Sequence, residues 1–343
     1  MKKILKAVVY GASGYTGAEL LRLLHTHPQV EVVALSGESQ AGKDIAEVYP
    51  HLRGLGLPRL KKIEEISLDG VDVVFCCLPH GTTQDAVAAV PKSVKTIDLS
   101  ADFRLKDITT YEQWYGKPHS QPELQAQAVY GLTELNKDAI RKARLVANPG
   151  CYPTSALLPL IPLLRAGLIS KDNIIIDAKS GVTGAGRKVA QNFLYTEVNE
   201  SIMAYGIATH RHTPEIEQEL GGGLLVTFTP HLVPMSRGIL STLYVDLKGA
   251  ANVEDLRHTL LDTYQNEPFM HILPEGELPS TAQVRGSNYC AIAVCRERRT
   301  GKAILVSAID NLTKGSSGQA IHNMNLMFGL EETMGLQHLA VFP

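Results

Sequence analysis

An apolar run that passes through a glycine-rich turn into an amphipathic segment, near the start of the chain, constrains the fold more than any other feature. Lys6-Ala7-Val8-Val9-Tyr10 predicts a buried strand. Gly11-Ala12-Ser13-Gly14-Tyr15-Thr16-Gly17 follows, and the residues through His25 predict a helix with leucines on one face. Strand, tight turn and helix in this order are typical of the first βαβ unit of a parallel sheet.

Two different patterns divide the chain and predict two domains. Up to residue 150, β-branched runs alternate with helical segments, which predicts an α/β fold with a parallel sheet. After Cys151, strand-like runs come closer together and predict an α+β domain with a mixed sheet over 151–311. The last helical stretch, within 312–343, is apolar on one face, so we expect it to complete the first domain, 1–150. The expected strands are 6–10, 30–35, 71–77, 96–99, 145–147, 174–177, 224–229, 239–247, 291–295 and 303–309.

Composition excludes several classes of protein. The 33 basic and 35 acidic residues give a net charge of -2, so no basic excess favours nucleic acid. No apolar run approaches the ~20 residues that cross a bilayer, so we expect no membrane partner. The five cysteines are irregularly spaced, which argues against disulfides and for the cytoplasm. No Cys/His spacing matches a zinc site, so we expect no metal.

The glycine-rich turn is a candidate dinucleotide site. Glycines 11, 14 and 17 permit a tight turn whose backbone N–H groups approach a pyrophosphate at the start of a helix, and Ser13, Tyr15 and Thr16 share that turn. The spacing differs from G-x-G-x-x-G, so an ordinary strand-to-helix turn is the alternative.

The residues after the second strand bear on the choice between NAD and NADP. An acidic residue there would favour NAD. Ser36 and Ser39 instead offer hydrogen bonds to a 2′-phosphate, and Lys43 adds positive charge, whereas Glu38 favours NAD. We therefore expect NADP.

Cys151 is the candidate nucleophile. It lies where a strand ends and a helix begins, and the helix dipole there favours the thiolate. A buried structural cysteine is the alternative. That alternative better describes Cys76, Cys77, Cys290 and Cys295, since the first two lie within an apolar strand.

Three further segments carry polar side chains suited to catalysis or binding. In His210-Arg211-His212 we predict His210 as the acid/base residue, with His212 as the alternative and a solvated helix start as the non-functional interpretation. Arg104 follows the fourth strand and is a candidate for holding a phosphate or carboxylate, with an ordinary surface arginine as the alternative. Asn311 and Gly315 precede the last helix and suit contact with the cofactor, or a helix cap.

Taken together, these motifs resemble the N-acetyl-gamma-glutamyl-phosphate reductase family of the semialdehyde dehydrogenase superfamily over essentially the whole chain. The resemblance is carried by Gly-Ala-Ser-Gly-Tyr-Thr-Gly at 11–17, Leu-Pro-His-Gly at 78–81, Asp-Leu-Ser-Ala-Asp-Phe-Arg at 98–104, Asn-Pro-Gly-Cys-Tyr-Pro-Thr at 148–154, His-Arg-His-Thr-Pro-Glu-Ile at 210–216 and Asp-Asn-Leu-Thr-Lys-Gly at 310–315. It implies a Rossmann-like cofactor domain and a catalytic domain that mediates homo-oligomerisation, as a dimer or tetramer, in the cytoplasm.

The resemblance also implies a reaction. N-acetyl-gamma-glutamyl phosphate would be reduced with NADPH to N-acetylglutamate 5-semialdehyde and phosphate, in arginine biosynthesis, through a thioester on Cys151 with His210 as acid/base. Candidate residues for the substrate pocket are Arg104, Ser180, Arg187, His212, Ser287 and Asn288. Two alternatives stay open: a related enzyme acting on aspartyl or aminoadipyl phosphate, and an NADP-binding sensor without catalysis.

Overall fold

The computed structural model describes residues 3–187 and 189–343, and the chain forms two compact units. Unit 1 consists of the residues up to Pro149 together with Ser316–Gln337; unit 2 consists of Gly150–Gly315 and His338–Pro343. The chain therefore returns to unit 1 at Ser316, four residues later than the expected 312, and the last six residues belong to unit 2. The predicted boundary at 150 differs from the observed one by a single residue.

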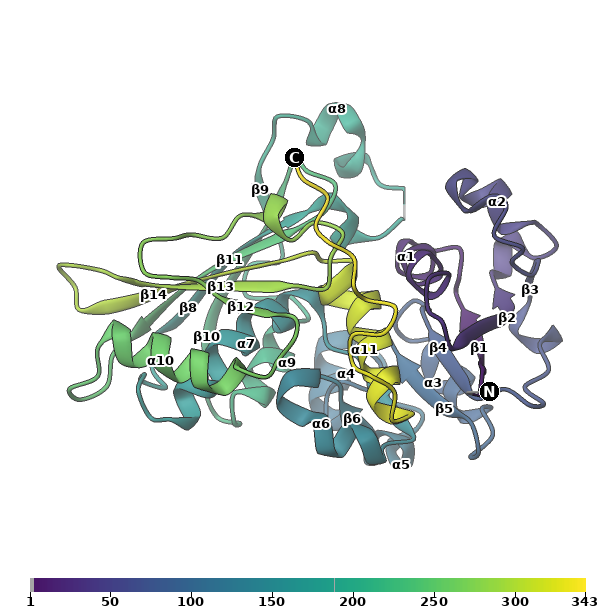
Figure 1. Ribbon diagram of the computed structural model, residues 1–343, viewed down its shortest axis with the longest axis horizontal. Helices are drawn as coiled ribbons and strands as arrows, with labels where there is room; N and C mark the ends of the chain where they lie inside the picture. Colours follow the sequence, from purple (N-terminus) through teal and green to yellow (C-terminus); the bar gives the residue numbers. More distant parts are fainter. Residues whose placement is uncertain (1–2, 188) are drawn as a thin grey trace. The chain divides into compact units, whose positions relative to one another are not determined.

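Unit 1 is an α/β unit built on a parallel sheet (Figure 1). Its described strands are β1 (Leu5–Tyr10), β2 (Val30–Ser36), β3 (Leu60–Lys61), β4 (Val73–Cys76), β5 (Lys95–Asp98), β6 (Val129–Tyr130) and β7 (Leu145–Ala147). They run parallel in the order β3-β2-β1-β4-β5-β7-β6. The order reverses direction between β1 and β4, and such switch points are where α/β sheets bind ligands.

Helices pack on this sheet and complete its core. They are α1 (Tyr15–Leu24), α2 (Ile45–Val48), α3 (Thr83–Ala88), α4 (Ile108–Tyr115), α5 (Pro122–Gln125), α6 (Thr133–Lys142) and α11 (Gly318–Met327). Every residue of α11 is buried, and this helix packs against α6, α1 and β5 (Figure 1, yellow). Helix α11 is thus a core element of unit 1.

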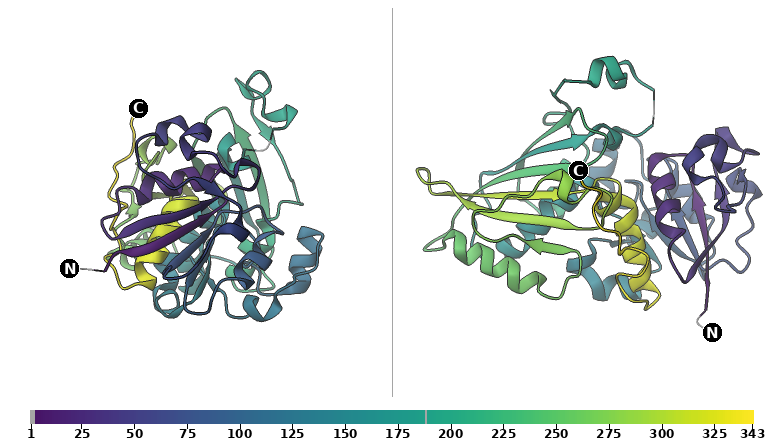
Figure 2. Two further views of the ribbon diagram at one scale, coloured as in Figure 1. Left: turned by 90° about the vertical axis from the view of Figure 1, so that its right-hand side faces the viewer. Right: turned by 45° about the horizontal axis from the view of Figure 1, so that its top comes forward.

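Unit 2 is an α+β unit with a mixed sheet (Figure 2). Its described strands follow the order β12-β13-β14-β11-β8-β10-β9, with parallel pairs β8/β10 and β12/β13 and antiparallel pairs elsewhere. The strands are β8 (Ile174–Gly181), β9 (Met203–Ala204), β10 (Val226–Val233), β11 (Ile239–Asp246), β12 (Met270–Ile272), β13 (Cys290–Arg296) and β14 (Lys302–Ile309). The helices are α7 (Cys151–Arg165), α8 (Tyr195–Val198), α9 (Thr213–Glu219) and α10 (Val253–Tyr264).

One face of this sheet is covered by helices and the other is half-exposed. Helix α7 packs on β11 and β14, and α10 packs on β13. Along β8 and β11, side chains alternate between buried and half-exposed, as period-2 strands with one covered face do. Asp177, Lys179 and Tyr244 are among the half-exposed residues.

Helix α7 is unusual because Pro159 and Pro162 lie inside it. A proline lacks the N–H that would bond the carbonyl four residues earlier, so Pro162 leaves the Leu158 carbonyl without its helical donor. The Tyr264 hydroxyl, at the end of α10, donates to that carbonyl oxygen at 2.6 Å. The tertiary hydrogen bond replaces the missing helical one, which explains how the helix continues past the proline.

Tyr264→Phe is therefore expected to destabilise the protein by about 1–3 kcal/mol, since it leaves a buried carbonyl unsatisfied while keeping the ring. Urea unfolding of the full chain measures the change. Tyr195→Phe is the matched control, because Tyr195 is 78% exposed and its substitution should leave stability unchanged. Equal stability of both variants would contradict this account of the proline.

Among the described residues, no helix is long and apolar enough to span a membrane. The stretch 101–131 contains the short helices α4 and α5. Asp107 caps α4 by accepting the N–H groups of Thr109 and Thr110. This cap fixes a helix whose apolar pattern is too short to be recognised.

Candidate active site

The predicted dinucleotide loop lies at the carboxyl end of β1, at the switch point of the unit 1 sheet. A Cβ at Gly11 would lie 2.4 Å from the Cys77 carbonyl oxygen, and one at Gly17 would lie 2.6 Å from Cα of Ala12. These two glycines are therefore required by close backbone approach within the turn itself.

Gly14 has a different environment. It is the N-cap of α1, no side chain caps that helix end, and an added Cβ would meet only the Gly11 carbonyl oxygen, at 3.6 Å. The amino-terminal end of α1 is thus left open, which suits the pyrophosphate of a dinucleotide.

The residues after β2 divide into buried and exposed ones. Ser36 is completely buried, and its Oγ accepts the Gly11 N–H at 2.9 Å. It supports the loop from beneath, instead of meeting a ribose phosphate as we expected. Ser39 is exposed. Glu38 accepts the Ile63 N–H at 3.1 Å, which ties the acidic side chain that would favour NAD to a neighbouring segment.

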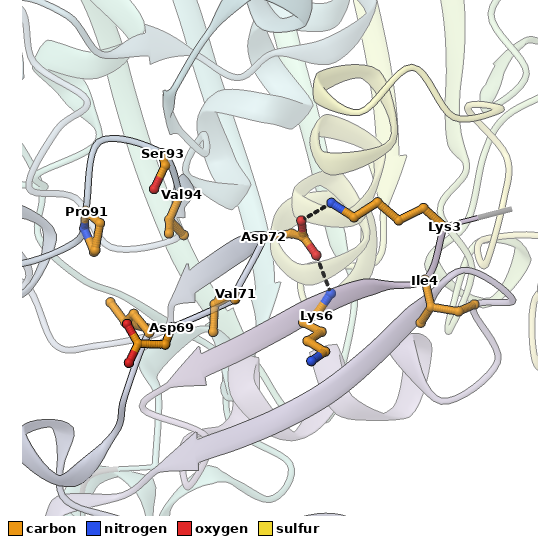
Figure 3. Close-up of a pocket in the computed structure, with 11 residues that line it drawn as sticks. Lys3, Ile4, Lys6, Asp69, Val71, Asp72, Pro91, Ser93 and Val94 are labelled. Carbon is orange, nitrogen blue, oxygen red and sulfur yellow. Dashed lines mark hydrogen bonds and ion pairs between the residues drawn. The ribbon is translucent and has the colours of Figure 1, made fainter.

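A cavity of about 490 Å³ opens at the opposite edge of the same sheet, beside the amino ends of its strands (Figure 3). The Asp72 carboxylate is bonded within the unit: Lys3 Nζ lies 2.5 Å from Asp72 Oδ1, and the backbone N–H of Lys6 donates to Asp72 Oδ2 at 2.9 Å. Ligands of α/β sheets bind at the carboxyl ends of the strands. This cavity is therefore not the dinucleotide site.

In unit 2, Cys151 is the first residue of α7 and is half-buried. Gly150 is the N-cap, and no side chain caps the helix end. The Glu215 carboxylate accepts the Gly150 N–H at 2.8 Å, which binds α9 to the residue before the cysteine. A Cβ at Gly315 would lie 2.7 Å from Cβ of Cys151. Gly315 thus allows the chain before α11 to approach the cysteine closely.

The two predicted histidines lie together beside this helix start. Their ring centroids are 4.8 Å apart. A Cβ at Gly150 would lie 2.6 Å from Nε2 of His212, so the His212 imidazole rests on the residue that precedes Cys151. Nδ1 of His210 accepts the His212 backbone N–H at 3.1 Å. In the neutral His210 ring, Nε2 therefore carries the proton.

The surroundings of His210 determine its protonation state. Burial lowers the pKa of His210 from 6.5 to about 4, and the neighbouring charge of Arg211 adds to the effect. His210 is therefore neutral at pH 7, with Nε2–H as a hydrogen-bond donor.

The other cysteines lie in surroundings typical of structural residues. Cys76 and Cys290 are buried. Burial raises the pKa of the Cys76, Cys77 and Cys295 thiols, with Asp98 adding to the effect on the first two. A raised pKa disfavours the thiolate. No group of three or more His, Cys, Asp or Glu in the described chain is arranged to hold a metal ion.

Arg104 belongs to unit 1 and is buried. Its Nε donates to the Asn148 carbonyl at 2.8 Å and its Nη2 to the Leu99 carbonyl at 3.0 Å. These bonds join the residues that follow β5 and β7. Arg104 therefore stabilises the fold of unit 1, a role that its position in the sequence did not indicate.

The remaining substrate candidates lie in unit 2 in different settings. Ser180 and Ser287 are buried, and their hydroxyls donate to the carbonyls of Gly181 and Val284. Arg187 is exposed. Asn288 is only 1% exposed, and neither end of its amide has a hydrogen-bond partner among the described residues. Asn288 therefore has the side chain most in need of a ligand.

Asn311 differs from expectation. It is buried, its amide oxygen accepts the Gly238 N–H at 2.7 Å, and its amide nitrogen donates to Thr183 Oγ1 at 3.0 Å. These bonds tie the end of β14 to the start of β11 and to the turn after β8, and the contact of Asn311 with the cofactor stays a prediction.

Comparison with known proteins defines the class. The family model described as "Semialdehyde dehydrogenase, NAD binding domain" matches residues 6–143, and "Semialdehyde dehydrogenase, dimerisation domain" matches 151–311. Aspartate semialdehyde dehydrogenase II from Vibrio cholerae has the same fold, with a TM-score of 0.72 and 16% identity over 96% of this chain and 99% of that one. The two matching family models and the fold place the chain among the semialdehyde dehydrogenases.

Closer relatives identify the family within this class. A protein from Rhodospirillum rubrum named N-acetyl-gamma-glutamyl-phosphate reductase is 53% identical over 100% of both chains. A probable chloroplastic N-acetyl-gamma-glutamyl-phosphate reductase from Arabidopsis thaliana is 52% identical over 100% of this chain and 86% of its own. The chain therefore belongs to the N-acetyl-gamma-glutamyl-phosphate reductase family.

Two side chains that contact the His210 ring, Tyr152 and Tyr205, were not predicted from the sequence. Tyr152 adjoins the nucleophile in the sequence, so its position was a signal; Tyr205 lies 54 residues from Cys151 in a segment without a recognisable motif.

Proposed function

We propose that the chain catalyses the NADPH-dependent reduction of N-acetyl-gamma-glutamyl phosphate to N-acetylglutamate 5-semialdehyde, with release of phosphate, in arginine biosynthesis. The observation that carries the proposal is the half-buried Cys151 at the uncapped start of α7, with His212 packed on the adjoining Gly150. The full-length relatives of 52–53% identity are named for this activity.

The chemistry begins at the Cys151 sulfur. As a thiolate, it attacks the acyl-phosphate carbonyl, the bond from that carbon to the phosphate oxygen breaks, and a thioester remains on the cysteine. N–H groups of the first turn of α7, which no side chain caps, are donors for the oxyanion that develops on the carbonyl oxygen. Arg104 is the candidate for holding the phosphate.

Proton handling falls to His210 and His212. His210 was predicted as the acid/base residue. Its neutral ring carries a proton on Nε2 and can donate a hydrogen bond to the carbonyl oxygen of the substrate. His212 rests on Gly150 and is the better placed to accept the proton of the Cys151 thiol. We therefore divide the acid/base task between the two imidazoles.

The residues of the unit 1 loop fit NADP. The N–H groups at the start of α1, beside Gly11, Gly14 and Gly17, would hold the pyrophosphate. Ser39, with Lys43 nearby, would meet the 2′-phosphate, because Glu38 is bonded to the Ile63 N–H. NADPH, when bound, supplies the hydride that reduces the thioester to the aldehyde level.

Substrate recognition is proposed for four polar side chains of unit 2. Asn288 has the strongest case, since its buried amide has no partner among the described residues. Ser180, Arg187 and Ser287 complete the group.

Assays in the reverse direction test the function. Purified protein is supplied with NADP, phosphate and one of three aldehydes: N-acetylglutamate 5-semialdehyde, aspartate semialdehyde or aminoadipate semialdehyde. We expect kcat/KM to favour the first by about 10- to 200-fold over the aldehyde that is one methylene longer. Preference for another aldehyde would assign the related activity, and absence of turnover with all three would favour the sensor.

We also propose that the chain forms a homo-oligomer in the cytoplasm. The half-exposed face of the unit 2 sheet, which includes Asp177, Lys179 and Tyr244, is the surface offered to a second copy. The matching family model over 151–311 is described as a dimerisation domain, and a sheet face without covering helices is a common element of subunit interfaces.

A further inference from the structure

An aromatic cluster surrounds the His210 imidazole. Tyr152 of α7, Tyr205 after β9 and Phe228 of β10 meet it edge to face, with ring centroids 5.6, 5.3 and 5.3 Å from that of His210. Tyr152 also contacts the His212 ring, at 5.9 Å. Side chains from three separate elements thus converge on the predicted acid/base histidine.

A directed chain of hydrogen bonds joins the two tyrosines. The Tyr152 hydroxyl donates to the His231 carbonyl oxygen at 3.1 Å, and the Tyr205 hydroxyl donates to the Tyr152 oxygen at 3.2 Å. The Tyr205 N–H donates to the Pro230 carbonyl at 3.1 Å, which fixes the residue to β10. Both ring and backbone of Tyr205 are therefore held in place.

Tyr205 is also the point at which an exposed segment returns to the site. Between β8 and β9 the chain carries exposed apolar side chains, including Val189, Tyr195 and Ile202, and α8 stands away from the sheet of unit 2 (Figure 2). Tyr205 is half-buried and comes directly after β9. Its ring contact with His210 thus lies where that segment ends.

We propose that Tyr205 is a positioning residue of the reaction, whose ring and hydroxyl bond to Tyr152 hold the His210 imidazole in one orientation and shield it from water. The inference rests on the proposed function, because the neutral His210 ring acts there as a hydrogen-bond donor to the carbonyl oxygen. Tyr205 touches the histidine and the second tyrosine, and it acts on the reaction through them.

A role in which Tyr152 or Tyr205 ionises during the reaction is less well supported than a positioning role. Burial raises the pKa of both phenols well above 10, and the nearby charge of Cys151 adds to the effect. The phenols therefore stay neutral: the Tyr205 hydroxyl keeps its proton and donates to the Tyr152 oxygen, and the Tyr152 hydroxyl donates to the His231 carbonyl oxygen. What they supply is orientation and a dry surface.

The titratable and charged groups around His210 come from each element packed against it. Arg211 and His212 lie on its own loop, Tyr152 and the Cys151 thiol on α7, and Tyr205 after β9; Phe228 of β10 is uncharged. Of these, Arg211 adds a positive charge that disfavours protonation of His210. Removal of the Tyr205 ring leaves that charge in place and admits water.

The test compares Tyr205→Leu and Tyr205→Phe with Tyr195→Phe, a conservative change at an exposed tyrosine of the same segment. The pKa of His210 is measured by NMR of the ring nitrogens in the full chain without ligands, alongside kcat and KM. For Tyr205→Leu we expect the pKa of His210 to move from about 4 toward 6.5 and kcat to fall roughly 10- to 100-fold with KM for NADPH unchanged. Tyr205→Phe keeps the ring, so the pKa should stay low and kcat should fall by less than about 10-fold.

The two measurements separate this inference from the proposed function. Because the titration needs no substrate, it reports the position of His210 even if the wild-type protein reduces a different acyl phosphate. A Tyr205→Leu protein with unchanged His210 titration and kcat would overturn the proposal, as would a Tyr205→Phe protein as impaired as Tyr205→Leu.

Discussion

Cys151→Ser is expected to lower turnover by several orders of magnitude while the affinity for NADPH stays unchanged. A serine hydroxyl ionises far less readily than a thiol, so the nucleophile that forms the thioester is lost. Removal of a catalytic nucleophile elsewhere costs about 10⁶ in kcat. The predicted dinucleotide loop belongs to unit 1 and Cys151 to unit 2, so NADPH binding should not respond. Stopped-flow turnover and NADPH fluorescence measure the two quantities.

Cys295→Ser is the matched control for this experiment. Cys295 is also a half-buried thiol of unit 2, and burial raises its pKa. Its replacement should leave turnover near the wild-type rate. Iodoacetamide should alkylate a single thiol rapidly at neutral pH in the wild-type protein and none in Cys151→Ser. Substantial turnover by purified Cys151→Ser would refute the covalent route.

The second large effect is expected from substitution of the two histidines. His210→Gln and His212→Gln should impair the reaction in different ways. General acid–base catalysis contributes about 10²- to 10⁴-fold, so His210→Gln and His212→Gln should each lower kcat within that range. His212→Gln should also slow alkylation of Cys151 at pH 7, because the base that accepts the thiol proton is removed. His210→Gln should leave alkylation at the wild-type rate and flatten the pH–rate profile.

His258→Gln is a suitable control, because His258 is exposed on α10 and pairs with Glu254 on the same helix. It should change neither alkylation nor turnover. If His210→Gln slows alkylation and His212→Gln does not, the roles are exchanged. Normal turnover in both variants would remove the histidines from the mechanism.

Much of the fold follows from local pattern. Buried strands such as β1 and β4 are continuous β-branched and aromatic runs, and parallel sheets covered on both faces require such runs. The short strands β3 and β6 were missed, since each has only two residues and is defined by pairing with a neighbour. The prolines of α7 also could not be interpreted locally, because the donor that replaces the lost N–H comes from Tyr264, 106 residues away.

Residues of the candidate site could be predicted where a reactive side chain lies at a position in the sequence that is typical of functional residues. Cys151 lies at a strand-to-helix junction, and that junction is visible in the residues themselves. Ser36 and Asn311 show what the sequence does not reveal: each was predicted as a ligand contact, which stays a prediction, and each side chain also accepts a hydrogen bond from a backbone N–H within its own unit. Burial decides between these outcomes, and burial depends on elements distant in sequence.

The division of unit 1 into two stretches of sequence has a consequence for how the protein is made. Helix α11, buried along its whole length, is synthesised after all of unit 2 up to Gly315. While the ribosome is translating that insert, the sheet already made lacks the helix that packs on β5 and α6, and its apolar surface stays exposed. Chaperone binding to nascent chains should therefore persist until α11 emerges.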